Sequence, residues 1–190
     1  MITDIDAIES VCKKLKQKKP EDAKKIIIKN LKFKPLDNAG RNYTEVQKTK
    51  VFKKDGFIDR YSGEKLVYPP VLRILSYLMP KEFPFHKNWK MSECHIAYWE
   101  LVPTIDHREP VSRGGEDKEE NWVYTSQLRN SAKSNWTLEE IGWKLHEPGD
   151  IKDWDGMMGW FMDYVSKNKH VLEDDAYIAK WHKAALTVLT

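Results

Sequence analysis

Residues 104–135 read TIDHREPVSRGGEDKEENWVYTSQLRNSAKSN, and this stretch decides our interpretation of the fold. It contains an adjacent acid and imidazole, Asp106 and His107, at the end of a short apolar segment. Asn121 follows His107 by 14 residues, and Asn130 follows it by 23. An acid, an imidazole and two carboxamides placed around one Gly-Gly turn are what a single-metal phosphodiesterase site would need.

The chemistry of phosphodiester hydrolysis assigns a task to each of these side chains. The reaction needs a base that activates water and a cation that stabilises the leaving oxygen. His107 suits the first task, because an imidazole titrates near neutral pH. Asp106 and Asn130 offer the hard oxygen ligands that Mg²⁺ prefers. Neighbouring side chains on a regular strand point to opposite faces, so Asp106 and His107 can share a site only where the strand bends or ends.

This stretch resembles the signature of the HNH nuclease family, which reads roughly D-H-x-x-P-x-x-x-G-G, then N, then N or H followed by x-x-K. Pro110, Gly114-Gly115 and Lys133 all stand in register with it. The resemblance implies a ββα-metal core, in which a strand, a loop, a second strand and a helix follow one another. It also implies the variant of the family that ends on Asn, here Asn130.

The resemblance implies a role for each matched residue. His107 would be the general base, and Asn121 would tie the loop so that the base points correctly. Asp106 and Asn130 would hold Mg²⁺, Mn²⁺ or another divalent ion. Lys133 would face a phosphate from the turn after Asn130. Three arginines are further candidates for phosphate contacts: Arg108, Arg113 and Arg129.

A second resemblance lies upstream, in residues 55–66, which read DGFIDRYSGEKL. Many HNH proteins carry a zinc-binding hairpin of the form D-G-x-x-C-x-x-C-G-x-x-L, with a second cysteine pair just before the last Asn. Asp59, Ser62, Ser126 and Arg129 stand at those four positions. None of them is a thiol, so no structural zinc is expected there. We expect an Asp59–Arg129 ion pair and serine hydrogen bonds to hold the hairpin on the helix instead.

Periodicity and turn residues predict the remaining elements. Helices are expected at residues 1–19, 20–33, 71–79, 126–134, 156–168 and 174–189, with another one capped by Thr137 and Glu140. Strands are expected within residues 95–107 and 122–125, and a hairpin at 54–68 turns at Ser62-Gly63. Residues 34–50 are expected to form a loop or a weak helix, and residues 81–93 an irregular segment.

The predicted architecture is α+β: a ββα-metal core with an upstream β-hairpin, surrounded by N- and C-terminal helices. We divide it into a basic helical arm (1–53), a nuclease core (54–136) and a C-terminal helical region (137–190) that packs on the core. An insertion at 67–100 could supply a recognition or dimer surface. The helical spacing of the C-terminal aromatic residues favours a core over a base-stacking surface; these residues are Trp154, Trp160, Phe161, Tyr164, Tyr177 and Trp181.

The net charge is only +3, but it is unevenly distributed. Residues 1–54 carry 15 basic and 7 acidic side chains, whereas residues 55–190 carry 17 and 22. A basic arm beside an acidic body suggests a contact with a polyanion near the N-terminus. A solvated, lysine-rich helix explains the same pattern, and charge alone leaves both interpretations open.

Composition bounds the class of protein. With 190 residues, of which 41% are hydrophobic, the chain can bury a globular core. It has no apolar N-terminal run and no apolar stretch of bilayer length, so we expect no signal peptide and no membrane partner. The two cysteines, Cys12 and Cys94, form no spaced cluster, which favours a reduced, cytoplasmic setting. A metal site from His86, Cys94 and His95 is an alternative with poor ligand spacing.

The sequence therefore predicts a metal-dependent HNH endonuclease that acts on double-stranded DNA, in a restriction-type role. A phage or mobile-element nicking or homing enzyme is an alternative with the same chemistry. A non-catalytic nucleic-acid-binding module that retains the fold belongs to a different class, and the joint presence of His107, Asp106 and Asn130 argues against it. Cutting two strands with one site per chain would favour a homodimer.

Overall fold

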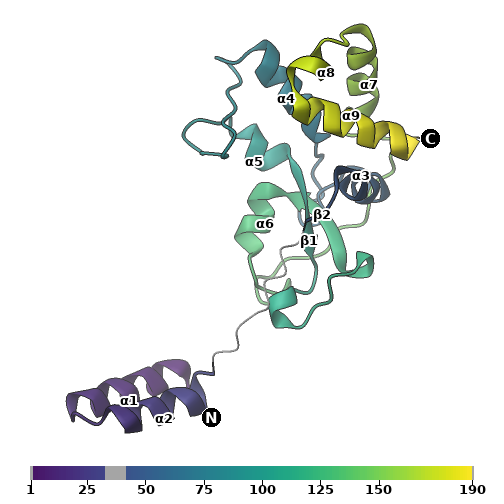
Figure 1. Ribbon diagram of the computed structural model, residues 1–190. Helices are drawn as coiled ribbons and strands as arrows, with labels where there is room; N and C mark the ends of the chain where they lie inside the picture. Colours follow the sequence, from purple (N-terminus) through teal and green to yellow (C-terminus); the bar gives the residue numbers. More distant parts are fainter. Residues whose placement is uncertain (1, 33–41, 190) are drawn as a thin grey trace. The chain divides into compact units, whose positions relative to one another are not determined.

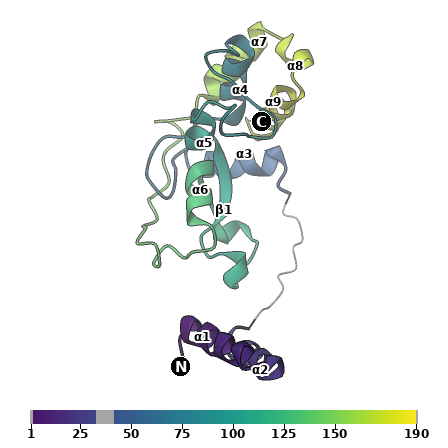
Figure 2. The ribbon, with the colours of Figure 1, turned by 90° about the vertical axis from the view of Figure 1, so that its left-hand side faces the viewer.

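The computed structural model describes residues 2–32 and 42–189, and it divides the chain into two compact units (Figures 1 and 2). The first unit is Met1–Arg41, and the second is Asn42–Thr190. The fold class is α+β, because the described residues form helices together with one small antiparallel sheet of two strands. None of the helices in the described ranges is long and apolar enough to cross a membrane.

The first unit is a pair of antiparallel helices, α1 (Asp4–Lys16) and α2 (Pro20–Asn30). Thr3 and Asp6 form a capping box at the start of α1, and Pro20 begins α2, where its missing N–H costs nothing. Both helices were predicted and are confirmed, although each is shorter than its predicted range.

The second unit holds all the remaining elements in the described part of the chain. Its helices are α3 (Glu45–Lys54), α4 (Pro69–Leu78), α5 (Ala97–Leu101), α6 (Gln127–Lys133), α7 (Met158–Lys167), α8 (Val171–Asp174) and α9 (Ala176–Leu189). Its strands are β1 (Pro103–His107) and β2 (Trp122–Ser126), and two 3₁₀ turns lie between them, η1 (Val111–Arg113) and η2 (Glu119–Asn121).

The two strands and α6 form the part of this unit that carries the candidate site. β1 pairs with β2 in antiparallel register, from Pro103 opposite Ser126 to His107 opposite Trp122. α6 follows β2 directly, because the Ser126 hydroxyl accepts the backbone N–H of Arg129 and caps the helix. The predicted order of strand, loop, strand and helix is confirmed.

An aromatic core joins the helices of the second unit to the sheet. Figure 1 shows α4, α7, α8 and α9 gathered at one end of this unit, while the strands and α6 lie at the other. Phe52 of α3 stacks on Trp181 of α9 and also contacts Tyr124 of β2. Phe161 is fully buried on α7. The C-terminal aromatics therefore contribute to a core, as predicted, although Trp160 and Tyr177 remain partly exposed.

The upstream hairpin is confirmed as a tight turn with a single bridge between Ile58 and Lys65. The N–H of Asp59 donates to the carbonyl of Glu64, and the N–H of Leu66 donates to the carbonyl of Phe57. Gly63 has φ +75°, a backbone conformation that favours glycine. The predicted turn at Ser62-Gly63 is therefore correct.

Three predicted elements need correction. Residues 95–107 were expected to be β-rich, but Ala97–Leu101 forms the helix α5 and only Pro103–His107 is a strand. Tyr98 made the segment look β-prone, yet its side chain is buried and its hydroxyl donates to the carbonyl of Leu72 on α4. This tertiary packing overrides the local preference of an aromatic residue.

The region predicted as a loop or a weak helix is also different. Residues 33–41 lie outside the described ranges, but Glu45–Lys54 is a regular helix whose Thr44–Gln47 capping box the prediction overlooked. This helix, α3, lies in the second unit and packs against α9 and both strands.

After α6, Thr137 and Glu140 form the capping hydrogen bonds that were predicted. Only turns follow, however, so the helix predicted after Thr137 is wrong, and Gly142 in this turn has φ +67°.

Candidate active site

His107 ends β1 and is almost fully buried, with 4% of its surface exposed. Its Nε2 lies 2.7 Å from Oδ1 of Asp117, which belongs to the loop between the strands. The same carboxylate oxygen accepts the Tyr43 hydroxyl at 2.6 Å and the Trp122 indole N–H at 2.8 Å. His107 is therefore held in a network that Tyr43, Asp117 and Trp122 build from three separate parts of the chain.

The network keeps the Asp117 carboxylate ionised. Desolvation is the largest single influence on this group and would raise its pKa. The hydrogen bonds from Tyr43, His107 and Trp122 oppose it together and lower the pKa of Asp117 to about 2. An anionic oxygen thus lies against the imidazole, although the Asp117 side chain itself is 39% exposed.

Asp106 takes part in a separate set of contacts. Its Oδ2 accepts the Tyr61 hydroxyl at 2.7 Å and lies 3.0 Å from the ammonium of Lys133. Burial, and secondly the Asp106 charge, raise the pKa of Tyr61 far above its usual value, so Tyr61 remains a donor. The side chains of Asp106 and His107 therefore bond to different partners, Tyr61 and Lys133 for Asp106 and Asp117 for His107.

Lys133 corrects one prediction. It was expected to face a phosphate, but its side chain is fully buried. Its ammonium donates to the backbone carbonyl of His107 at 2.8 Å and pairs with Asp106. Lys133 is thus an internal tie between α6 and the end of β1, and it is the group that joins the Asp106 and His107 positions.

Asn121 occupies the place predicted for it and ties the loop. Its Oδ1 accepts the N–H of Glu109 at 2.8 Å, and its Nδ2 donates to the carbonyls of Glu109 and Glu116. The backbone carbonyl of Asn121 also accepts the N–H of Arg108. These bonds close the loop directly after His107 and fix the path of the chain there.

Asn130 lies on α6, beside β1, and is partly exposed. Its Nδ2 approaches the carbonyl of Ile105 at 3.5 Å, and the amide oxygen takes no part in this contact. The hydrogen bonds of Asp106 within the described residues all use Oδ2, which leaves Oδ1. One carboxylate oxygen and one amide oxygen fit a hard divalent cation that keeps several waters. The donor chemistry therefore suits Mg²⁺ or Mn²⁺.

Two of the three candidate arginines already have acidic partners. Arg113 pairs with Glu140 at 2.6 Å and lies over the ring of Trp136. Arg129 pairs with Glu64 at 2.8 Å. The side chain of Arg108 is exposed at the end of β1, close in sequence to His107. Of the three, Arg108 is therefore the one best placed for a phosphate.

Two aspartates, rather than the predicted ion pair, dock the hairpin on β2. The Asp59–Arg129 pair was wrong, because Arg129 reaches Glu64 and the Asp59 carboxylate is filled by other donors. Asp59 accepts the N–H of Ser126 and the hydroxyl of Thr125, both at the end of β2. Asp55, also buried, accepts the N–H of Tyr124 at 3.1 Å.

Asp55 also pairs with the Arg60 guanidinium at 2.9 Å, while desolvation raises the pKa of its carboxyl. Of the two serines predicted to hold the hairpin, Ser126 caps α6 and Ser62 bonds Glu64 across the turn. The buried carboxylates of Asp55 and Asp59 thus hold the hairpin on β2, whereas the prediction gave this task to an Asp59–Arg129 ion pair.

The alternative metal site receives no support from the contacts of its cysteine. Cys94 is buried, accepts the backbone N–H of His86 and contacts its carbonyl. In residues 2–32 and 42–189, no group of three or more His, Cys, Asp or Glu side chains is disposed to hold a metal ion. The pair Asp106 and Asn130 is a different kind of set, since it combines one carboxylate with one carboxamide.

Three residues of the site were missed in the sequence. Asp117 stands ten residues after His107 in an acidic loop, where neighbouring acids hide it. Tyr61 belongs to the hairpin and lies 45 residues from Asp106, and Tyr43 precedes α3 and lies 74 residues from Asp117. No local pattern marks contacts at such separations.

Comparison of the chain with protein-family models, with curated proteins and with solved structures gives no match.

Proposed function

We propose that the protein is a metal-dependent DNA endonuclease of the HNH type. The observation that carries the proposal is the conjunction, on one strand–loop–strand–helix unit, of a buried imidazole, a loop closed by Asn121 and the oxygen donors Asp106 and Asn130. Each of these features matches a functional part of the family signature in residues 104–135. The proposal extends to a ββα-metal core without zinc, in which Asp55 and Asp59 replace the metal.

In this mechanism His107 is the general base that takes a proton from the attacking water. Water must then reach the imidazole, and Nε2 is at present covered by Asp117 at 2.7 Å. Asp117 lies on an exposed loop, and the negative charge of an incoming phosphodiester would repel it. The carboxylate therefore moves aside when DNA binds, and water takes its place.

Asp106 and Asn130 would hold the cation, Mg²⁺ or Mn²⁺. When bound, the ion stabilises the negative charge of the leaving oxygen. Lys133 positions the site, because it holds the Asp106 carboxylate and the His107 carbonyl at once. Tyr61 fixes the same carboxylate from the hairpin side. Arg108 is available to a phosphate.

The test is cleavage of a supercoiled plasmid with Mg²⁺ or Mn²⁺. The wild type should convert it to nicked or linear forms, and both EDTA and His107→Ala should abolish the conversion. Purifying His107→Ala identically controls for a contaminating nuclease. Binding of DNA without cleavage under every metal tested would favour the non-catalytic module instead. If the plasmid is cleaved, sequencing the cleaved ends would separate a restriction-type enzyme from a nicking or homing enzyme.

A further inference from the structure

The first unit carries a row of exposed apolar side chains along α1. Ile5, Ile8 and Leu15 are exposed by 70%, 47% and 52%, and Cys12 is exposed between them. Positions 5, 8, 12 and 15 alternate in steps of three and four, which places them on one side of a helix. This is the spacing with which one helix packs along another.

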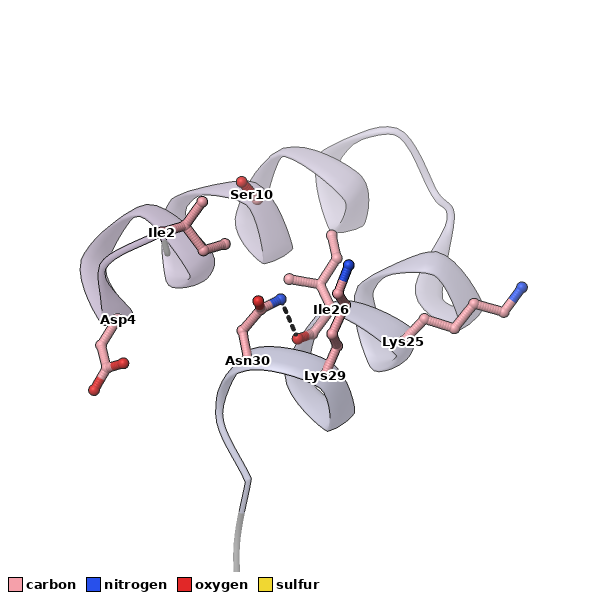
Figure 3. A pocket seen from close by; sticks show the side chains of 7 residues that line it. All are labelled: Ile2, Asp4, Ser10, Lys25, Ile26, Lys29 and Asn30. Atoms are coloured by element: carbon pink, nitrogen blue, oxygen red, sulfur yellow. Dashed lines mark hydrogen bonds between the residues drawn. The ribbon is translucent and has the colours of Figure 1, made fainter.

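The opposite side of α1 borders a groove of the same hairpin. Figure 3 shows the residues that line this groove: Ile2, Asp4 and Ser10 come from the α1 side, and Lys25, Ile26, Lys29 and Asn30 come from α2. At 100° per residue, Ser10 lies on the opposite side of α1 from the apolar row. On α2, Ile27 and Ile28 follow the groove residue Ile26, and the helix turns them away from it with 42% and 62% exposed.

The two helices of the hairpin bury few large side chains between them. Its buried side chains within the described residues are small or medium in size: Ala7, Val11 and Ala23. Isolated helices of 13 and 11 residues are marginal in water, and a layer of helices needs a second layer on its apolar face. A face with several large exposed apolar residues marks a contact surface.

The distribution of charge along α1 favours a second copy of the chain as the partner. The first half of the helix carries Asp4, Asp6 and Glu9, whereas the second half carries Lys13, Lys14 and Lys16. When two copies pack antiparallel through this helix, the acidic half of each lies along the basic half of the other. A parallel pair would place like charges together. The helix is thus electrostatically complementary to its own antiparallel copy.

We propose that the α1–α2 hairpin is a dimerisation layer, in which the row Ile5, Ile8, Cys12 and Leu15 packs antiparallel on the same row of a second chain. The two hairpins form a four-helix bundle around a two-fold axis. This inference stands apart from the nuclease proposal, because the assembly is measured without DNA. If the nuclease proposal also holds, the dimer supplies one site for each strand.

Sedimentation equilibrium of the full chain at micromolar concentration tests the assembly. The wild type should have twice the 22.4 kDa mass of one chain. Ile8→Glu/Leu15→Glu should weaken the dimer more than about tenfold, because it places charges at the centre of the apolar face. Ser10→Glu, on the polar side of α1, should leave the dimer unchanged. A monomeric wild type would overturn the proposal, as would a dimer that survives the double substitution.

Oxidative cross-linking tests the orientation and does not depend on the glutamate variant remaining folded. In a Cys12→Ser background, Ile5→Cys/Leu15→Cys should form covalent dimers, because residue 5 of one chain lies opposite residue 15 of the other. Ile5→Cys alone should not, since two residues 5 are then about 15 Å apart, beyond the reach of a disulfide. Equal cross-linking of both variants, or of neither, would contradict the antiparallel packing.

Discussion

Lys133 shows how burial decides the role of a charged residue in this site. In the sequence Lys133 lies one helical turn beyond Asn130. That spacing is compatible with a phosphate contact and equally with a contact inside the protein. In the structure its ammonium is fully buried between Asp106 and the carbonyl of His107. A buried cation with an acidic partner stabilises the fold, and DNA cannot reach it.

Replacing Lys133 with Met should therefore lower stability and not DNA affinity. The buried Asp106 carboxylate would lose its ionic partner, a loss that costs about 3–5 kcal/mol in the free energy of unfolding. Urea denaturation measures this cost. Lys118→Met is the matched control, because Lys118 pairs with Glu116 on the surface, and its loss should cost under about 1 kcal/mol. A stable Lys133→Met variant whose DNA binding is less salt-dependent would restore the phosphate role.

Asp117 is the residue whose role most depends on motion. In the structure it holds Nε2 of His107, the atom that we assign to the attacking water. Asp117→Asn removes the charge that ties the loop to His107 and keeps the size of the side chain. We expect the rate of plasmid cleavage to stay the same or to rise a few-fold, because the amide leaves the imidazole more readily. A fall of about 10²-fold or more, measured at saturating DNA, would show that Asp117 is needed in catalysis.

At the scale of elements, the hairpin of residues 55–66 and the strand β2 are joined by hydrogen bonds from carboxylates to backbone N–H groups. Asp59 reaches Ser126, and Asp55 reaches Tyr124. The register of the hairpin could be predicted, because its Asp-Gly and Ser-Gly steps are local signals. The partner of Asp59 could not, since Arg129 and the end of β2 are equally near in sequence and only the folded geometry separates them.

Asp59→Asn and Arg129→Ala should differ in their cost. An Asn side chain presents an N–H where Asp59 accepts from Tyr61, Thr125 and Ser126, so a buried donor would be left unsatisfied at about 1–3 kcal/mol. Arg129 loses only a pair with Glu64, which is 69% exposed, so its replacement should cost under about 1 kcal/mol. Thermal denaturation compares the two variants directly. Equal costs would mean that Arg129 contributes to docking the hairpin.

The elements that were predicted wrongly have different physical causes. Tyr98 favours a strand by its local preference, but its ring packs against Phe83 and Phe85 and its hydroxyl bonds to α4. Such contacts come from distant parts of the chain and leave no trace in a local pattern. α3 is different, because its capping box was a readable signal that the polar composition of the segment concealed.

At the scale of the whole molecule, the chain combines two units that differ in how much of their apolar surface is buried. Asn42–Thr190 buries a continuous aromatic core, and that core supports the strands and α6. Met1–Arg41 contains a hairpin that leaves most of its large apolar side chains exposed. Matched positions in residues 104–135 predicted the element order and the position of Asn121. The networks around His107 and Asp106 could not be predicted, because Tyr43, Tyr61 and Asp117 join the site only through tertiary packing.

The central claim is that His107 acts as the base beside a cation held by Asp106 and Asn130. The most direct test is the single-turnover rate of DNA cleavage as a function of Mg²⁺ concentration. We predict that His107→Ala lowers this rate by about 10²–10⁴-fold at every Mg²⁺ concentration. Asn130→Ala should recover part of its loss as Mg²⁺ is raised, because a weakened cation site can still be filled. Cleavage by His107→Ala at the rate of the wild type would contradict the account.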